Sequence, residues 1–261
     1  MLEMRSISKS FNRGTAVEKL AINNLDFSME EGDFVTVIGG NGAGKSTLLN
    51  LIAGVYPTDF GLITINGLDV THKKDYERAS LVSRVFQDPI AGTAGNMNIE
   101  ENLSLSLRRG MRRTLRWGAS IKEVSLYKEK LESLGLGLET RLNTKVGLLS
   151  GGQRQALTLL MATLTKPAIL LLDEHTAALD PKTAQTVLET TKKITEMNNQ
   201  TTLMVTHNMK DAIKYGNRLI MMHEGKIIFD CRGEDKKKLT VPDLLAKFNE
   251  IGEVNDRIVL N

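Results

Sequence analysis

The sequence has almost no cysteine and no long apolar run. A single cysteine, Cys231, among 261 residues excludes an internal disulfide framework and is typical of proteins in a reducing cytoplasm. No apolar run approaches the roughly 20 residues that a membrane-spanning helix needs. The first residues, Met1 to Arg5, lack the basic and then apolar segments of a signal peptide. We therefore expect the protein to act at any membrane from outside the bilayer.

The sequence also has little excess charge. It contains 34 lysines and arginines against 31 aspartates and glutamates, a formal net charge of +3 at pH 7. A nucleic-acid-binding chain usually has a pronounced basic excess or stripe, so we expect no nucleic-acid partner. Hydrophobic residues at 41% and charged residues at 25% are usual for globular proteins. The length suffices for one large α/β domain or two small ones.

Short apolar runs rich in branched residues alternate with amphipathic stretches of helical period. Four runs are predicted to be strands: 34–38, 82–86, 169–172 and 203–206. Several are almost continuously apolar, which is typical of parallel sheets covered by helices on both faces. Helices are predicted to begin after Gly44, Ser150 and Asp180, the last with Pro181 in its first turn. In the helix after Ser150, a buried stripe is predicted from Leu157, Leu160, Met161 and Leu164.

The stretch from about residue 88 to 149 has a different character. It is richer in charged and polar residues and has no strong strand, so we expect a mostly helical subdomain inserted into the sheet domain. Its segment Arg108–Trp117 contains five arginines. These arginines could lie against anionic lipid headgroups or form a solvated basic face, and both interpretations stay open.

A glycine-rich segment carries the first chemical motif. Residues 39–47 match the phosphate-binding loop and lie between a predicted strand and a predicted helix, which is the context the pattern requires. The candidate nucleotide-binding residues are Gly39, Gly40, Asn41, Gly42, Ala43, Gly44, Lys45, Ser46 and Thr47. The glycines let the backbone wrap a phosphate chain closely, and the helix start adds positive potential. We expect Lys45 to reach the β- and γ-phosphates of ATP and Ser46 to bind Mg²⁺.

Two acidic residues follow the apolar run at 169–172. They predict Asp173 beside the metal and Glu174 beside the γ-phosphate, at the end of a buried strand. Two carboxylates at such a position could instead begin a solvated loop. The phosphate-binding loop earlier in the chain favours the catalytic interpretation.

The third motif comprises Leu149, Ser150, Gly151, Gly152 and Gln153, at the start of a predicted helix. A serine and two glycines at a helix N-terminus form a second anion site. With this string the chain resembles the nucleotide-binding domains of ABC proteins, whose signature is LSGGQ. The resemblance extends from about Phe11 to Phe229, with the diagnostic motifs in the family order.

The resemblance implies an α/β fold of the P-loop NTPase (RecA-like) kind. Its core would be a mostly parallel sheet, with an antiparallel β subdomain and an inserted α-helical subdomain. The predicted domain is a single nucleotide-binding domain over residues 1–261, with an ATP-binding core (1–87 and 161–229), a helical subdomain with the signature (88–160) and a short C-terminal tail (230–261). In that tail, Lys236–Lys238 precedes a predicted helix near Pro242–Phe248.

The resemblance also implies roles for single residues. Gln87 would contact Mg²⁺ or the attacking water and link the sheet domain to the helical one. His207 would touch the γ-phosphate, and Glu174 would orient or deprotonate the attacking water. Phe11 would stack on adenine with Val17 nearby. Ala178, Leu179 and Asp180 match the loop that crosses the dimer interface, and the signature would face the γ-phosphate held by a partner subunit.

One departure from the family pattern lies beside the acidic pair. His175 stands where a proline usually follows. We predict that its ring faces solvent, with contact at the dimer interface as the alternative.

The single cassette without a membrane segment implies partner chains. We expect a second copy of the chain around two Mg²⁺–ATP, transmembrane permease subunits and an extracytoplasmic substrate-binding protein, at the cytoplasmic face of the cell membrane. The form of the loop at residues 41–47 and the short tail most resemble those of subunits that serve amino-acid or sugar-type permeases, so we expect an importer of amino acids or similar small solutes. The alternatives are an exporter or a regulatory ABC complex acting on cell-wall enzymes. A soluble ABC protein acting on ribosomes or DNA usually has two tandem cassettes or long insertions, and this chain has neither.

Overall fold

The predicted strands and helices are present in a computed structural model that describes residues 1–111 and 119–250. The described residues form two compact units, residues 1–78 with 200–250 and residues 79–111 with 119–199. The predicted boundary at residues 160–161 falls inside a helix of the second unit, and the division into core and helical subdomain stays a prediction.

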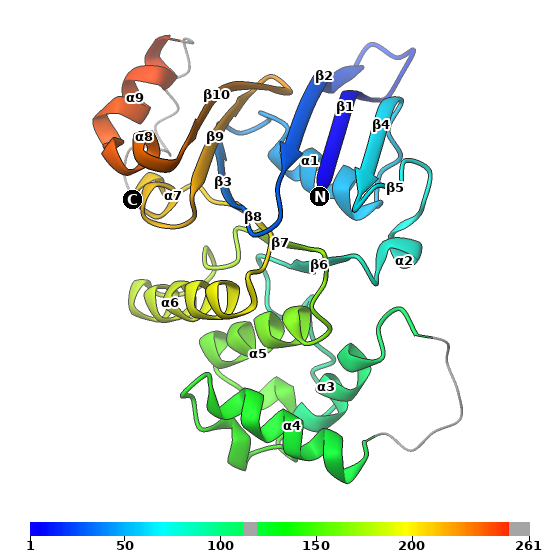
Figure 1. The fold of residues 1–261 in the computed structure, drawn as a ribbon, viewed down its shortest axis with the longest axis vertical. Helices are drawn as coiled ribbons and strands as arrows, with labels where there is room; N and C mark the ends of the chain where they lie inside the picture. The colour runs from blue at the N-terminus through cyan, green and yellow to red at the C-terminus, as the bar shows by residue number, and fades with distance from the viewer. Residues whose placement is uncertain (112–118, 251–261) are drawn as a thin grey trace. The chain divides into compact units, whose positions relative to one another are not determined.

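Two sheets organise the first unit (Figure 1). The antiparallel sheet has the order β2-β1-β4-β5, and the other group of strands has the order β10-β9-β3-β8. The strands are β1 (Leu2–Phe11), β2 (Lys19–Met29), β3 (Phe34–Gly39), β4 (Phe60–Ile65), β5 (Leu68–Asp69), β8 (Thr202–Val205), β9 (Arg218–His223) and β10 (Lys226–Arg232). β3 pairs in parallel with β8 and β9, and its residues after Phe34 are all buried.

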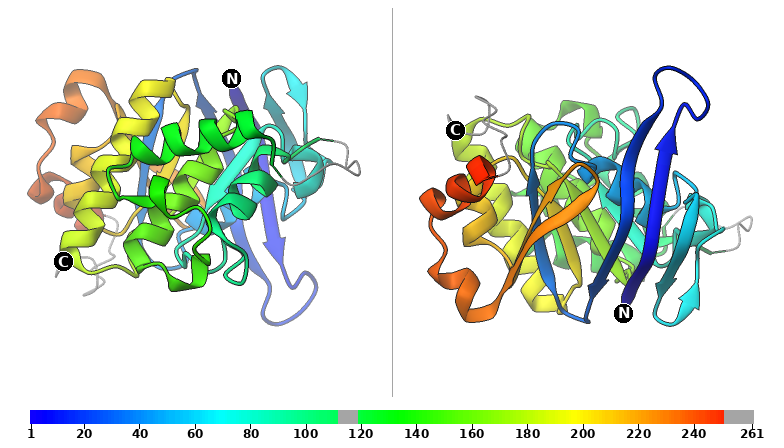
Figure 2. Two further views of the ribbon diagram at one scale, coloured as in Figure 1. Left: turned by 90° about the horizontal axis from the view of Figure 1, so that it is seen from below. Right: turned by 90° about the horizontal axis from the view of Figure 1, so that it is seen from above.

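The helices of the first unit are α1 (Lys45–Ala53), α2 (Asp75–Arg78), α7 (Met209–Lys214), α8 (Gly233–Lys238) and α9 (Val241–Glu250). α9 confirms the helix predicted in the tail. Its Leu244 and Phe248 are buried in one cluster with Met209 of α7 and Leu219 of β9. The C-terminal segment up to residue 250 therefore belongs to the core of this unit. The loop between β1 and β2 extends beyond the strands that it joins (Figure 2).

The second unit pairs a short parallel ladder with helices. Its elements are β6 (Val82–Val85), α3 (Ile99–Leu107), α4 (Ile121–Glu132), two short 3₁₀ turns (Leu138–Thr140 and Val146–Leu148), α5 (Gly151–Thr163), β7 (Ile169–Asp173) and α6 (Pro181–Asn198). β6 and β7 run in parallel with Val82 opposite Ile169. α5 contacts β6, α3, α4 and α6.

The predicted stripe on α5 is too narrow. Leu157 and Leu160 are buried as predicted, and Met161 and Leu164 are half-buried. All residues from 155 to 160 are buried, because α5 has neighbours on several sides rather than on one face. A helical stripe predicted from periodicity alone assumes a single packed face.

Candidate nucleotide site

The phosphate-binding loop follows β3 and leads into α1. Gly42 and Gly44 have φ values of 84° and 101°, in the left-handed region that glycine adopts readily. A Cβ on Gly44 would lie 2.6 Å from the carbonyl oxygen of Ala21, so a side chain does not fit there. Gly44 is also the N-cap of α1 and makes no side-chain cap hydrogen bond. The first amides of a helix have no partner within the helix, so a helix start of this kind is a suitable place for an anion.

Lys45 lies inside this loop. It is 6% exposed, and its Nζ donates to the carbonyl oxygens of Gly39 at 2.7 Å and Gly40 at 2.9 Å. A buried ammonium requires such acceptors, and phosphate oxygens offer the same chemistry with more negative charge. Ser46 is exposed in the first helical turn. The glycine cradle with its internal lysine fits a polyphosphate.

A buried arginine that no sequence motif marks holds the far end of α1. Arg78 is 1% exposed, and its Nη1 donates to the carbonyl oxygens of Leu51 at 2.7 Å and Ile52 at 2.8 Å. Burial lowers the pKa of Arg78 to about 10, so the guanidinium stays protonated at neutral pH. A cation at the C-terminal carbonyls of α1 is favourably placed in the helix dipole and fixes the helix behind the loop.

Phe11, the predicted adenine contact, ends β1 and is half-buried. Its ring meets Tyr56 edge to face at 5.2 Å, and Lys9 Nζ lies 5.7 Å from its centroid. Tyr56 lies just after α1, and the sequence analysis did not indicate it as a partner of Phe11 because no motif marks it. Val17 is 69% exposed in the β1–β2 loop. The adenine contact of both residues stays a prediction.

His207 lies at the same sheet edge as the phosphate-binding loop. β3 and β8 are parallel neighbours, with Val37 opposite Val205, and the loop and His207 both follow their carboxyl ends. Thr206 N donates to Val37 O at 3.1 Å, and Asn208 caps α7. Ligands of open parallel sheets bind at this edge. The first unit thus brings together Lys45, Ser46 and the exposed His207.

The second unit brings Gln87, Asp173 and Glu174 to one edge in the same way. β6 and β7 are parallel, and these residues lie at or just beyond their carboxyl ends. Glu174 has a φ of 47°, an uncommon left-handed value for a residue with a side chain. Such backbone strain clusters at functional sites. Asp173 forms an ion pair with Arg84 of β6, a partner that no sequence motif indicated.

The signature opens α5 as predicted. Ser150 is the N-cap: its Oγ accepts from Gln153 N, and Gln153 Oε1 accepts from Ser150 N, both at 3.3 Å. The two glycines have a packing reason as well. A Cβ on Gly151 would lie 3.2 Å from Leu179 Cδ2, and one on Gly152 would overlap the methyl group of Thr183.

The interface loop therefore lies beside the signature within the second unit. Asp180 caps α6 by accepting a hydrogen bond from Thr183 N at 3.1 Å. Hydrogen bonding with Thr183 lowers the pKa of Asp180. The loop 178–180 is thus anchored at its end by the helix that follows it, and the start of α5 packs against Leu179.

Gln155 of α5 is hydrogen-bonded to both catalytic loops of this unit, the loop after β6 that carries Gln87 and the loop after β7 that carries Glu174. It is fully buried, and its Nε2 donates to Phe86 O at 3.1 Å and to His175 O at 2.7 Å. Phe86 directly precedes Gln87, and His175 directly follows Glu174. Sequence reasoning missed this residue because it lies two positions beyond the signature. The signature helix is thereby bonded to both catalytic loops.

Neither interpretation of His175 is right. The side chain is 1% exposed, and its Nε2 lies 3.0 Å from Thr191 Oγ1 of α6. Burial lowers the pKa of His175 to about 4, so the ring is neutral at pH 7. The histidine is a packed part of the second unit, because α6 lies against the turn that follows Glu174.

The arginine-rich segment is also anchored inward at its start. Arg108 pairs with Glu123 at 3.2 Å, and Arg109 Nη2 donates to Ser83 Oγ at 2.5 Å and to Ala162 O at 3.1 Å. Burial lowers the pKa of Arg109. Arg109 is therefore turned inward, whereas the Arg108 side chain keeps 34% of its surface exposed, and for the segment as a whole both interpretations stay predictions. Residues 112–117 of the segment lie outside the described residues.

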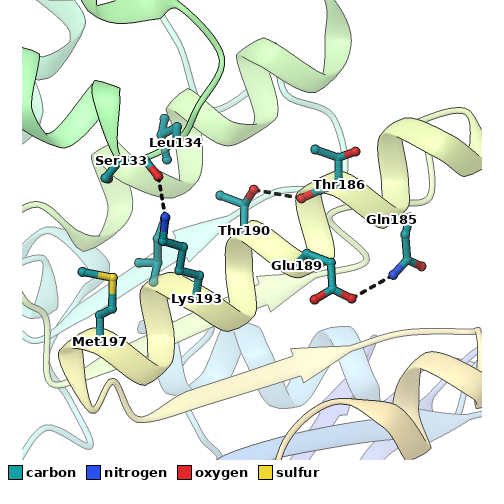
Figure 3. Close-up of a pocket in the computed structure, with 9 residues that line it drawn as sticks. Ser133, Leu134, Gln185, Thr186, Glu189, Thr190, Lys193 and Met197 are labelled. Atoms are coloured by element: carbon teal, nitrogen blue, oxygen red, sulfur yellow. Dashed lines mark hydrogen bonds between the residues drawn. The ribbon is translucent and has the colours of Figure 1, made fainter.

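A hollow of about 360 Å³ lies in the second unit, between α6 and the turn after α4 (Figure 3). Lys193 Nζ donates to Ser133 O across it at 3.0 Å, and Met197 is 70% exposed at its rim. None of the predicted nucleotide-site residues lines it. It is therefore separate from the catalytic loops of this unit.

Comparisons with known proteins agree with these motifs. Residues 22–177 match the family model described as "ABC transporter". The chain is 47% identical over 248 residues to a "Tyrosine transport ATP-binding protein" of Clostridioides difficile (strain R20291), covering 95% of this chain and 98% of that protein. It is 32% identical to a "Spermidine/putrescine import ATP-binding protein PotA" of Haemophilus influenzae (strain ATCC 51907 / DSM 11121 / KW20 / Rd), covering 98% of this chain but only 63% of that longer protein.

A solved ATP-binding cassette has the same fold. Its structure, a dimeric post-hydrolysis state bound to ADP and Pi, superimposes with a TM-score of 0.74 at 28% identity and covers 89% of this chain and 98% of that one. The chain thus belongs to the ABC transporter family. It is an ATPase with the P-loop NTPase fold, the ATP-binding subunit of a transporter. None of the helices in the described part of the chain has the length and apolar character to span a bilayer.

Proposed function

We propose that this chain powers the import of an amino acid, with tyrosine or a similar solute as the first candidate. The 47% identity to a tyrosine transport ATP-binding protein over nearly the whole of both chains supports this substrate class. Two copies would close head to tail around two ATP molecules and act on transmembrane permease subunits at the cytoplasmic face of the membrane. An extracytoplasmic binding protein would deliver the solute.

The chemistry follows from charge. Transfer of the γ-phosphoryl group spreads negative charge over its oxygens, so positioning and electrostatic stabilisation provide most of the catalysis. Lys45 and the loop amides would hold the phosphates, and His207 would donate to the γ-phosphate. Glu174 would orient the attacking water, and the partner's signature amides would close the site.

The side chains of Ser46, Gln87 and Asp173 offer oxygen donors of the kind that Mg²⁺ prefers. Ser46 and Gln87 would hold it together with Asp173, a set with one carboxylate that leaves room for phosphate oxygens and water. Bound there, the ion would neutralise charge on the phosphates. The observation that carries the ATPase part of the proposal is Lys45, buried in its own glycine loop on two carbonyl oxygens that phosphate oxygens could replace as acceptors.

Two variants test the ATPase mechanism. Glu174→Gln should bind ATP with an affinity like that of the unsubstituted protein, lose at least about 100-fold in turnover, a barrier of about 2.7 kcal/mol, and accumulate as a dimer with ATP. Lys45→Ala should lose ATP binding. Fluorescent-nucleotide titration, phosphate release and light scattering measure these effects. Near-normal turnover in Glu174→Gln removes Glu174 from this role.

The import proposal has its own test. The chain should co-purify with a permease, and ATP-dependent uptake of radiolabelled tyrosine into vesicles containing the complex should disappear with Lys45→Ala. Efflux in place of uptake would indicate an exporter, and hydrolysis without transport of any tested amino acid would refute this substrate class.

A further inference from the structure

Arg84 lies where it can act on the predicted metal ligand. In the β6–β7 ladder Arg84 is opposite Leu171. Asp173 is two residues further along β7 and therefore projects on the same face. Arg84 Nη2 reaches the Asp173 carboxylate at 2.5 Å, and the two side chains are 15% and 16% exposed. Because both side chains are largely shielded from water, the attraction between their charges is screened less than in a surface ion pair.

The same guanidinium has a second contact. Its carbon lies 4.9 Å from the centre of the Phe86 ring, a distance at which a cation is attracted to an aromatic face. Phe86 directly precedes Gln87, and its carbonyl oxygen accepts from Gln155. A metal ion would compete for the first of these contacts, the one with Asp173, but not for the contact with the Phe86 ring.

We propose that Arg84 is a positioning residue that occupies Asp173 as an internal cation and thereby sets the Mg²⁺ concentration that the nucleotide site requires. The inference rests on the proposed function, in which Asp173 is a Mg²⁺ ligand. In the absence of Mg²⁺, Arg84 compensates the charge of a carboxylate that would otherwise be largely buried and alone. When Mg²⁺ arrives, it must share or displace that contact, and the adjacent positive charge weakens its binding.

The chemistry of arginine makes this competition persistent. A guanidinium is a permanent cation with five donors in a planar fork. Lysine would keep the charge but not the planar fork or the ring contact. Substitution by an uncharged side chain should therefore raise the affinity for Mg²⁺, whereas lysine should retain most of the competition.

The experiment measures Mg²⁺ dependence rather than turnover. A fluorescent, non-hydrolysable ATP analogue at fixed concentration is titrated with Mg²⁺, and its binding in EDTA is measured separately. In Arg84→Met the half-saturating Mg²⁺ concentration should fall about tenfold, equivalent to about 1.4 kcal/mol. Arg84→Lys should stay within about threefold of the unsubstituted protein. Binding of the analogue in EDTA should be the same in all variants.

Arg108→Met is the matched control, because it makes the same change of charge in the same unit but breaks the pair with Glu123. It should leave the Mg²⁺ midpoint unchanged. Should Arg84→Met fail to fold by circular dichroism, Arg84→Gln carries the same test. An unchanged or higher midpoint in the uncharged variants, with normal binding in EDTA, overturns the inference alone. Failure of the unsubstituted protein to bind the analogue with or without Mg²⁺ overturns the proposed function as well.

Discussion

Mild acid should destabilise the nucleotide-free protein through one buried histidine. His175 is 1% exposed, and burial lowers its pKa to about 4 from the ordinary 6.5. Between these two pH values the unfolded chain binds a proton that the folded chain excludes. Stability contributed by the neutral ring is therefore fully present above pH 6.5 and is lost as the pH falls from 6.5 toward 4.

The structure sets the size of the effect. A pKa of about 4 in place of 6.5 corresponds to a loss of about 3.4 kcal/mol once the ring is protonated in both states. At pH 5 only the unfolded chain is protonated to any extent, and the loss relative to pH 8 is about 2 kcal/mol. Because globular proteins are stable by only about 5–15 kcal/mol, urea unfolding detects a change of this size.

His175→Gln provides the comparison, because glutamine keeps a polar group near Thr191 but does not titrate. Urea unfolding followed by circular dichroism at pH 8, 7, 6 and 5 gives both stability curves. At pH 8 the difference in unfolding free energy between the unsubstituted protein and the variant measures the packing lost on substitution. At pH 5 this difference in free energy should be smaller by about 2 kcal/mol. In NMR spectra the His175 imidazole signal can be assigned because it is absent from the variant. This signal should not shift between pH 8 and 5. Parallel stability curves, or an imidazole midpoint near 6.5, would refute the burial argument.

Three further substitutions test other contacts. Gln155→Leu should deprive the carbonyl oxygens of Phe86 and His175 of their buried donor, at a cost of about 2 kcal/mol in urea unfolding, and should lower kcat more than nucleotide affinity; normal kcat contradicts its positioning role. Arg109→Met should lower the unfolding free energy by about 1–3 kcal/mol and leave anionic-liposome binding unchanged, whereas weaker liposome binding would restore a lipid contact. Gly44→Ala should abolish binding of fluorescent ATP, since its Cβ would lie 2.6 Å from a backbone oxygen of β2; retained affinity would show that the loop tolerates a side chain.

The sequence was sufficient where a motif and its structural context are local. The phosphate-binding loop could be predicted because glycines 42 and 44 supply the backbone freedom that a strand-to-helix turn around phosphate needs. The helix starts after Ser150 and Asp180 could be predicted for the same kind of reason, since cap residues bond to amides three positions away. The order of these motifs along the chain then indicates a single protein family.

The functional residues that no sequence motif indicated depend on contacts between segments that are distant in the chain. Arg84 meets Asp173 only through the register of β6 on β7, and Gln155 meets Phe86 and His175 only through the packing of α5. Periodicity does not specify which strand lies beside which. His175 was misjudged because a single substitution for proline shows nothing about what covers it, and α6 packs against it.

The signature glycines combine two requirements that a simple substitution cannot separate. As proposed anion ligands, Gly151 and Gly152 must leave their amides open to phosphate. As packing residues, they let the start of α5 approach Leu179 and Thr183, where a Cβ would be crowded or would overlap. A Gly152 variant would therefore lose turnover through this overlap even if the amides of Gly151 and Gly152 did not bind a nucleotide. Ser150 already carries a Cβ, and its hydroxyl accepts a cap hydrogen bond from Gln153 N. The anion role is therefore better judged at the serine, where the structural cost of alanine is only about 1 kcal/mol.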